Sequence, residues 1–178
     1  MVEILTKSSK ETMMKDETKV LDVLEQHAKE TVDEIAKRSG VSRQKIWRII
    51  RRLEENKIIW GYSAIADGTL RDFKHYVLLV KRNTVPFDAS FKKELIFDKL
   101  DDYLPGLVKI ENIYLTHGSF DGVITFYTSD LIYAKKFIQK ISKKIGKYFE
   151  EYLLLETLFP MRKQGVKNPQ MNKLVEYF

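Results

Sequence analysis

The chain has 178 residues, 44% of them hydrophobic and 31% charged, which suits one large or two small domains with ordinary cores. It has no cysteine, which excludes zinc–thiolate sites, cysteine nucleophiles and iron–sulfur clusters. The net charge of +6 hints at an anionic partner. No apolar run approaches the roughly 18 to 20 residues that span a bilayer, and the first residues lack the apolar stretch of a signal peptide. We therefore expect a cytoplasmic protein with no membrane partner.

The first part of the chain has the pattern of two packed helices. Apolar residues recur at helical spacing over about 16–29, which predicts a first helix. Thr31 and Glu34 have the spacing of a capping box, so a short second helix is predicted over 32–39. It should stop at Gly40, which suits a left-handed position after a helix.

A third helix is predicted from Ser42, at the N-cap position, to about Asn56, whose tolerance of positive φ suits a helix end. Its apolar stripe at i, i+3, i+4, i+7 consists of Ile46, Ile49, Ile50 and Leu53. Two helices joined by a tight turn, after a helix to pack on, form a helix-turn-helix. Residues 58–65, with a turn at 66–69, are predicted to form a hairpin, the wing of this domain.

The rest of the chain alternates strands and helices. We predict, in order, a strand at 74–83, a helix at 88–103 ended by Pro105–Gly106, strands at 108–117 and 120–128, a helix at 130–146 and a strand at 149–160. This βαββαβ order is that of a ferredoxin-like domain. The fold class is therefore α+β, with an N-terminal winged helix-turn-helix and a C-terminal ferredoxin-like domain.

The predicted strands are apolar at consecutive positions, as in Tyr76–Val80 and Tyr152–Leu155. A sheet with one wet face should alternate apolar and polar residues, so both faces of this sheet are expected to be buried. Two helices cover one face, and a second copy of the chain is expected on the other, giving a homodimer. The alternative is that the wing domain folds onto that face.

The third predicted helix has the charge of a nucleic-acid reader. Five basic residues and no acidic one lie between Ser42 and Arg52, and the face opposite the apolar stripe carries Gln44, Trp47, Arg48 and Arg51. In a major groove, arginine recognises guanine and glutamine recognises adenine. Ser42 and Arg43 are placed to reach a phosphate or the first base.

The sequence thus predicts double-stranded DNA as a partner, contacted by Ser42, Arg43, Gln44, Trp47, Arg48 and Arg51. The same residues allow two alternatives. The charged face could simply be solvated, and Trp47 could flank the core instead of touching a thymine methyl group. The six lysines between Lys135 and Lys147 are expected on a solvated outer face, with guidance of DNA around an oligomer as the alternative.

These residues carry a family resemblance. The stretch 16–67, with Asp33–Ala36, Gly40–Ser42 and Ile58–Tyr62, is similar to the winged helix-turn-helix of the leucine-responsive (Lrp/AsnC) regulators. Residues 80–159 resemble the effector-sensing (RAM-type) domain of that family. The resemblance implies a transcriptional regulator that dimerises through its C-terminal sheets, often forms higher oligomers, and binds an amino acid or related metabolite between subunits.

In the same way, Thr116–Asp121 is similar to the family's glycine-x-x-aspartate turn, which makes Gly118, Ser119 and Asp121 effector-binding candidates. A glycine turn exposes N–H groups to a carboxylate, and an aspartate can meet an ammonium group. The alternative is that Gly118 only permits the turn while Asp121 bonds the local backbone. His117 is a weaker candidate. The chain departs from the family where Lys57 replaces the glycine usual after the reading helix.

The expected organisation is an N-terminal extension at 1–15, the DNA-binding domain at 16–67, a linker at 68–73, the effector-binding and dimerisation domain at 74–160, and a tail at 161–178. No catalytic residue, metal or cofactor is expected, because the three histidines are scattered and no phosphate-binding loop or nucleophile elbow occurs. Two other functions are weighed against this one: an enzyme resembling the sirohaem decarboxylases, which share this architecture, and a metabolite-binding oligomer without a DNA role.

Overall fold

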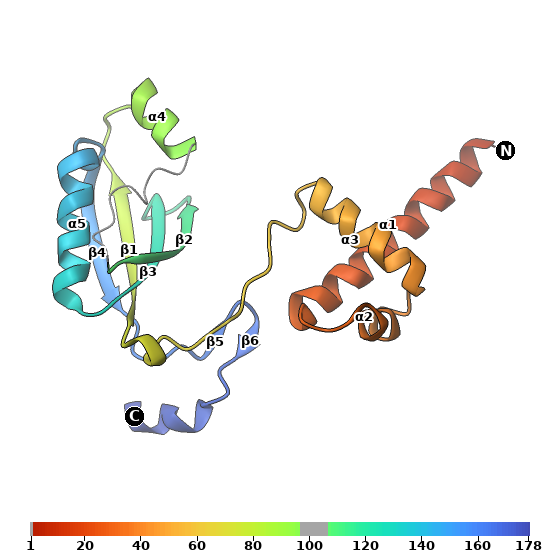
Figure 1. Ribbon diagram of the computed structural model, residues 1–178. Coiled ribbons are helices and arrows are strands. Elements are labelled where there is room, and N and C mark those ends of the chain that lie inside the picture. Colours follow the sequence, from red (N-terminus) through yellow and green to blue (C-terminus); the bar gives the residue numbers. More distant parts are fainter. Residues whose placement is uncertain (1, 97–106) are drawn as a thin grey trace. The chain divides into compact units, whose positions relative to one another are not determined.

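The computed structural model describes residues 2–96 and 107–178, which divide into two compact units (Figure 1). The N-terminal unit comprises Met1–Ile65 and Arg162–Asn168, and the C-terminal unit comprises Ala66–Met161 and Pro169–Phe178. Each unit has its own hydrophobic core. Among the described residues, no helix combines the length and the apolar character needed to cross a membrane.

Three helices form the N-terminal unit: α1 (Val2–His27), α2 (Val32–Ser39) and α3 (Arg43–Glu55). Their shared core is made of Val20, Leu24, Ile35, Val41, Ile46, Ile49 and Leu53. The helix predicted over 16–29 therefore begins much earlier, at Val2, and ends at His27. The first residues contain no glycine or proline, so nothing in the backbone stops the helix from continuing through them.

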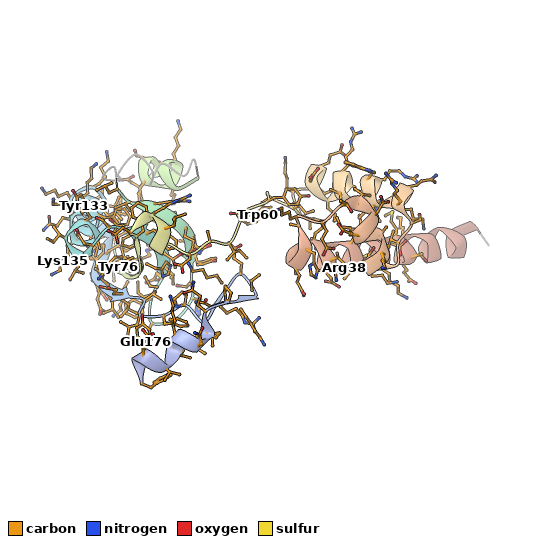
Figure 2. The ribbon with its side chains drawn as sticks, turned by 60° about the horizontal axis from the view of Figure 1, so that its bottom comes forward. Arg38, Trp60, Tyr76, Tyr133, Lys135 and Glu176 are labelled. Atoms are coloured by element: carbon orange, nitrogen blue, oxygen red, sulfur yellow. The ribbon has the colours of Figure 1, made fainter. Side chains whose placement is uncertain are left out.

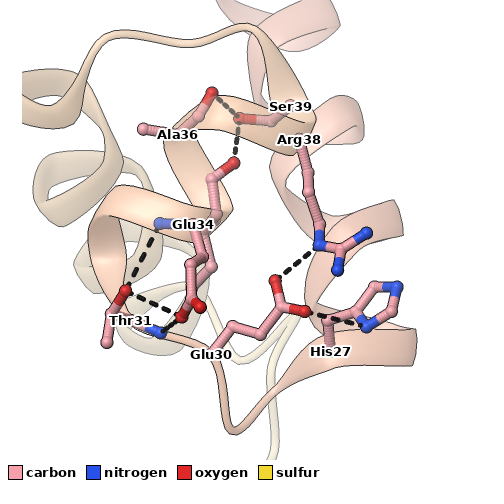
Figure 3. A network of polar contacts seen from close by, with 8 residues as sticks. His27, Glu30, Thr31, Glu34, Ala36, Arg38 and Ser39 are labelled. Atoms are coloured by element: carbon pink, nitrogen blue, oxygen red, sulfur yellow. Dashed lines mark hydrogen bonds and ion pairs between the residues drawn. The ribbon is translucent and has the colours of Figure 1, made fainter.

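The turn between α1 and α2 is held by two small polar networks, shown in Figure 3. The predicted capping box is confirmed: the Glu34 amide donates to the Thr31 hydroxyl, and the Thr31 amide donates to the Glu34 carboxylate. Glu30 accepts a hydrogen bond from Arg38 at 2.6 Å and pairs with His27 at 3.2 Å. The predicted end of α2 is confirmed too, since Gly40 has a φ of 68°.

The end of α3 differs from the prediction. Asn56 is the C-cap with a φ of −81°, and the positive φ of 58° belongs to Lys57. The amide of Lys57 donates to the Glu54 carbonyl, and the amide of Ile58 donates to the Leu53 carbonyl. This pair of bonds is a Schellman motif, which requires its left-handed residue at the position after the C-cap. A lysine therefore adopts the conformation that glycine adopts most easily.

The predicted hairpin over 58–69 is wrong. Residues 58–67 form no strand, and the segment ends in a short 3-10 turn, η1 (Thr69–Arg71). Ile58, Trp60 and Tyr62 of this segment are exposed, Trp60 by 94%. Trp60 is labelled in Figure 2. The apolar residues alternate as in a strand, but no other described strand pairs with the segment to make a ladder.

The C-terminal unit is a four-stranded antiparallel sheet of order β2-β3-β1-β4, built from β1 (Lys74–Arg82), β2 (Lys109–Leu115), β3 (Gly122–Thr128) and β4 (Phe149–Glu156). Helices α4 (Ala89–Ile96) and α5 (Leu131–Ile145) complete the predicted ferredoxin-like order. The rest of the helix predicted to 103, and its stop at Pro105–Gly106, lie outside the described residues.

The core of this unit lies between the sheet and the helices. Tyr76, Leu78 and Val80 of β1 alternate with half-buried residues and pack against α4 and α5 together with Ile124, Phe126, Phe137 and Ile141. At Gly122 a Cβ atom would lie 2.9 Å from the Val80 Cγ2 atom, so this position needs glycine for the close approach of β3 and β1. The lysines of α5 are exposed, Lys135 among them (Figure 2).

The sheet face that points away from α5 is called the open face. Val77, Leu79 and Val123 are half-buried there, and Leu153 and Leu155 of β4 are exposed. The apolar character expected of this face is present, but it is interrupted at one end by polar side chains from β1, β2 and β3. The face is therefore not a continuous apolar surface.

The chain after β4 does not continue the sheet, so β4 is shorter than the predicted strand at 149–160. Strands β5 (Arg162–Lys163) and β6 (Val166–Lys167) pair as a small hairpin, and a 3-10 helix, η4 (Met171–Tyr177), follows. The hairpin groups with the N-terminal unit, whereas η4 groups with the C-terminal unit.

Candidate DNA-binding surface and effector site

All six predicted DNA-contacting residues lie on the exposed side of the start and middle of α3. The core contacts come from the opposite face of the helix, through Ile46, Ile49 and Leu53. Trp47 is 63% exposed, so it belongs to the outward face and does not flank the core. Ser42 occupies the N-cap position with extended backbone, but its side chain makes no capping bond. DNA contacts by these side chains stay a prediction.

The cations of α3 differ in what they contact. Arg43 pairs with Asp33 at 3.1 Å, and Arg51 pairs with Glu55 at 2.7 Å. Both pairs are exposed, and pairs of that kind contribute only about 0–1 kcal/mol, so phosphates can replace their acidic partners. Arg48, between them, makes no hydrogen bond or ion pair within the described part of the chain. Its guanidinium can therefore bind DNA without first breaking an ion pair.

The two remaining cations of α3 hold α1 in place. Lys45 Nζ lies 3.4 Å from Asp16, and Arg52 Nε donates to Glu17 at 2.5 Å. Arg52 also reaches the Met13 sulfur at 2.8 Å. These contacts join residues about one-sixth of the chain apart or more, so no local sequence signal could reveal them. They assign Arg52 to packing of the domain and give the exposed Lys45 a partner on α1, which the charge count alone does not distinguish from DNA contact.

The predicted effector turn is held by hydrogen bonds, each of which involves a backbone group. The Asp121 carboxylate accepts from the Arg82 amide at 2.8 Å, the Asp121 carbonyl accepts from Thr116, and the Thr116 hydroxyl donates to the Phe120 carbonyl. Gly118 has a φ of 152°, a backbone conformation that residues other than glycine rarely adopt. Gly118 and Ser119 are exposed. One oxygen of Asp121 thus has the structural role that the sequence left open as the alternative.

A cavity of about 210 Å³ lies between the sheet and the helices at this end of the C-terminal unit. Its walls are apolar, and they include Phe87, Phe91, Ile124, Ile141, Ile145 and Phe149. Arg82 and Asp121 line the same cavity, whereas Gly118 and Ser119 do not. The structure therefore brings only one of the three predicted effector residues to the cavity.

Arg82 is a residue that the sequence did not single out. Its guanidinium carbon lies 3.8 Å from the centre of the Phe87 ring, and its Nη2 atom is 3.5 Å from the Val85 carbonyl. Its Nε atom is buried without a hydrogen-bond partner among the described residues. A buried N–H group of a cation that lacks an acceptor is a place where an anionic group of a ligand would be stabilised.

A second polar cluster that the sequence did not reveal interrupts the open face of the sheet. His75 Nδ1 lies 2.6 Å from the Thr157 hydroxyl and its Nε2 atom lies 3.0 Å from Glu111. Glu111 also accepts from Thr125 at 3.1 Å and from Tyr127 at 3.0 Å. Glu111 lies on this face because side chains alternate along a strand and its neighbour Ile110 packs against the core.

Among the described residues, no group of three histidines, aspartates or glutamates could hold a metal ion. His27 pairs with Glu30, and His117 is exposed. Burial raises the pKa of Tyr76 to about 12, which keeps its phenol neutral in the core.

The comparisons with known proteins agree with this geometry. Residues 16–59 match the family model "Winged helix-turn-helix DNA-binding". A Bacillus subtilis (strain 168) protein, the uncharacterized HTH-type transcriptional regulator YugG, is 27% identical over 105 residues, which are 59% of this chain and 61% of that relative. The match thus spans less than two thirds of its length.

Solved structures show the same fold. An AsnC family transcriptional regulator from Agrobacterium tumefaciens is 19% identical with a TM-score of 0.63, over 88% of this chain and 97% of that one. A transcriptional regulator from Neisseria meningitidis, in complex with L-Met, is 15% identical with a TM-score of 0.63, over 83% and 91%. B. subtilis LrpC is 16% identical with a TM-score of 0.60, over 83% and 95%. The fold that this resemblance implied is therefore confirmed: residues 16–59 match a helix-turn-helix DNA-binding family model, and the chain shares the fold of these solved Lrp/AsnC regulators.

Proposed function

We propose that the protein is a sequence-specific transcriptional regulator of Lrp/AsnC type, which reads the major groove of double-stranded DNA with α3. The observation that carries this proposal is the exposed face of α3. There Arg48, which has no partner among the described residues, lies between two arginines held only by exposed ion pairs. Arg48 and Gln44 would contact base edges, Trp47 a thymine methyl group, and Arg43, Arg51 and Ser42 the backbone.

Selection of bound sequences from random DNA by the purified chain tests this function. A dimer places its reading helices about 34–36 Å apart, so a pseudo-palindrome with half-sites one helical turn or a multiple apart is expected. Recovery of no enriched motif, with binding that is equal on all duplexes, would reject sequence-specific reading.

The dimer is proposed to form through the open face of the sheet, with higher oligomers built from such dimers. Val77, Leu79 and Val123 would pack on their counterparts, and Leu153 and Leu155 would become buried. Burial of these exposed apolar side chains supplies the driving force for association. The alternative, in which the DNA-binding domain covers this face, predicts a monomer in sedimentation experiments.

The effector is proposed to be an amino acid or a related small metabolite, bound at the cavity beside the turn. The Neisseria regulator named above is described in complex with L-Met. In this chain Arg82 would meet a carboxylate and Asp121 an ammonium group, while the apolar walls accept the side chain. The exposed Gly118 and Ser119 would offer backbone and hydroxyl groups to the same ligand where a neighbouring subunit closes over the turn.

Binding at this site would shift the dimer or oligomer geometry with a coupling of about 1–3 kcal/mol, which changes DNA affinity about 5- to 150-fold. A thermal-shift panel of the amino acids, on the native chain and on Arg82→Gln, tests it. Stabilisation by at least one amino acid that Arg82→Gln abolishes is expected. Equal stabilisation of both chains would show that the ligand binds at a site without Arg82.

In this proposal the protein acts in the cytoplasm without catalysis. Residues 16–67 would bind DNA, 68–73 would link the domains, and 74–160 would bind the effector and form the dimer, flanked by the extension at 1–15 and the tail at 161–178. An enzyme resembling the sirohaem decarboxylases is tested by adding a tetrapyrrole: a shifted absorption band would favour that activity over the regulator.

A further inference from the structure

The hairpin of β5 and β6 belongs to the DNA-binding unit although it comes from the far end of the chain. Arg162–Asn168 group with Met1–Ile65. Gln164 and Gly165, at its tip, line the same hollow as Leu21 and Leu24 of α1 and the segment after α3 from Ile58 to Ser63. The hairpin is therefore packed beside the stretch in which a winged domain carries its wing, and where this chain has no strand.

Its geometry is that of a tight hairpin. Gln164 and Gly165 have φ values of 44° and 81°, and positive values at both central residues define the turn that best matches strand twist. The Arg162 guanidinium closes the turn by donating to the Gly165 carbonyl. A two-stranded hairpin alone is only marginally stable in water, so contact with the unit is what keeps this one folded.

The hairpin is also strongly cationic. Arg162 and Lys167 lie directly opposite each other in the ladder, where like charges are destabilising, and Lys163 lies beside them. Both facing cations are exposed. The sequence from Thr157 to Val175 contains no aspartate or glutamate. Two facing cations without an acidic neighbour in sequence are relieved when an anion comes between or above them.

We propose that this C-terminal hairpin is the wing of the DNA-binding domain, with Arg162, Lys163 and Lys167 contacting phosphates beside the site that α3 reads. The inference rests on the proposed DNA-binding function and adds a second contact to it. A hairpin of this size with exposed cations fits the DNA backbone, and in this proposal its cations contact phosphates and not base edges. It would therefore strengthen binding to all sequences equally.

The experiment compares the full chain with the triple variant Arg162→Gln/Lys163→Gln/Lys167→Gln. Affinity for the selected operator and for an unrelated duplex is measured from 50 to 200 mM salt. Each lost phosphate contact lowers the slope of log K against log salt by about 0.9, so up to about 2.7 is expected from three. The ratio of native to variant DNA affinity then falls about 40-fold from 50 to 200 mM salt, while the ratio of operator to unrelated-duplex affinity is the same for both chains.

A matched control removes the same charge elsewhere. Lys135→Gln/Lys140→Gln/Lys143→Gln neutralises three exposed lysines of α5 in the C-terminal unit. If the hairpin is the wing, this control keeps the native slope of log K against log salt. Equal slopes for the native chain and the hairpin variant, or an equal loss in both variants, would overturn it. If the native chain binds no duplex at any salt concentration, the proposed function fails, and this is distinguishable because no slope exists to compare.

Discussion

Replacing Lys57 by glycine should stabilise the N-terminal unit. Lys57 is exposed and has a φ of 58° at the left-handed position of the Schellman motif that ends α3. A side chain in that region costs about 1–2 kcal/mol, and glycine loses about 0.5–1 kcal/mol more backbone entropy on folding. The net gain expected for Lys57→Gly is thus about 0.5–1 kcal/mol, or about 2–8 °C in the melting temperature of a domain of this size.

Urea unfolding followed by the helical circular dichroism signal measures this gain. Asn56→Gly is the matched control, because Asn56 has a φ of −81° and gains nothing from glycine. It is expected to leave stability unchanged or to lower it. A larger gain from Asn56→Gly than from Lys57→Gly would refute the assignment of the left-handed residue, and with it the direction in which the chain leaves α3.

Three other predictions concern the C-terminal unit. Hydrogen bonds from the Tyr148 hydroxyl, the Phe91 amide and Lys147 hold the pKa of Asp88 well below its usual value. The ionised Asp88 therefore stabilises the folded state above the ordinary carboxyl pKa, and this contribution to the free energy of unfolding is lost as pH falls below about 5. Asp88→Asn should flatten this acid dependence of unfolding. Leu153→Lys, on the open sheet face, should shift sedimentation from dimer to monomer, whereas Ile132→Lys on α5, which is also exposed, should not. Asp121→Ala should abolish effector responses, and a response that survives intact would reject the turn as part of the site.

Local signals predicted the elements that local chemistry decides. The capping box of Thr31 and Glu34 set the start of α2, and Gly40 set its end, because both depend on residues adjacent in sequence. The order of strands and helices followed from changes in apolar periodicity. The structure arranges these strands in the order β2-β3-β1-β4.

Long-range contacts decided what the sequence could not. The helix α1 runs through its polar start because nothing interrupts it, and Met13 and Glu17 then pack on Arg52. No other described strand pairs with the predicted wing, and no property of residues 58–69 themselves reveals this. Separating Arg48 from the paired arginines required the positions of Asp33 and Glu55, and finding Arg82 required the cavity.

Sequence-specific regulation depends on Arg48 of α3 reading a base. The most direct measurement is the ratio of operator to unrelated-duplex affinity for the native chain and for Arg48→Ala. Loss of a bidentate contact to guanine costs about 1–3 kcal/mol of discrimination, so the ratio should fall about 5- to 150-fold. The control Lys135→Ala should keep the native ratio. Equal weakening of both affinities by Arg48→Ala would contradict base reading, because it would make Arg48 a phosphate contact.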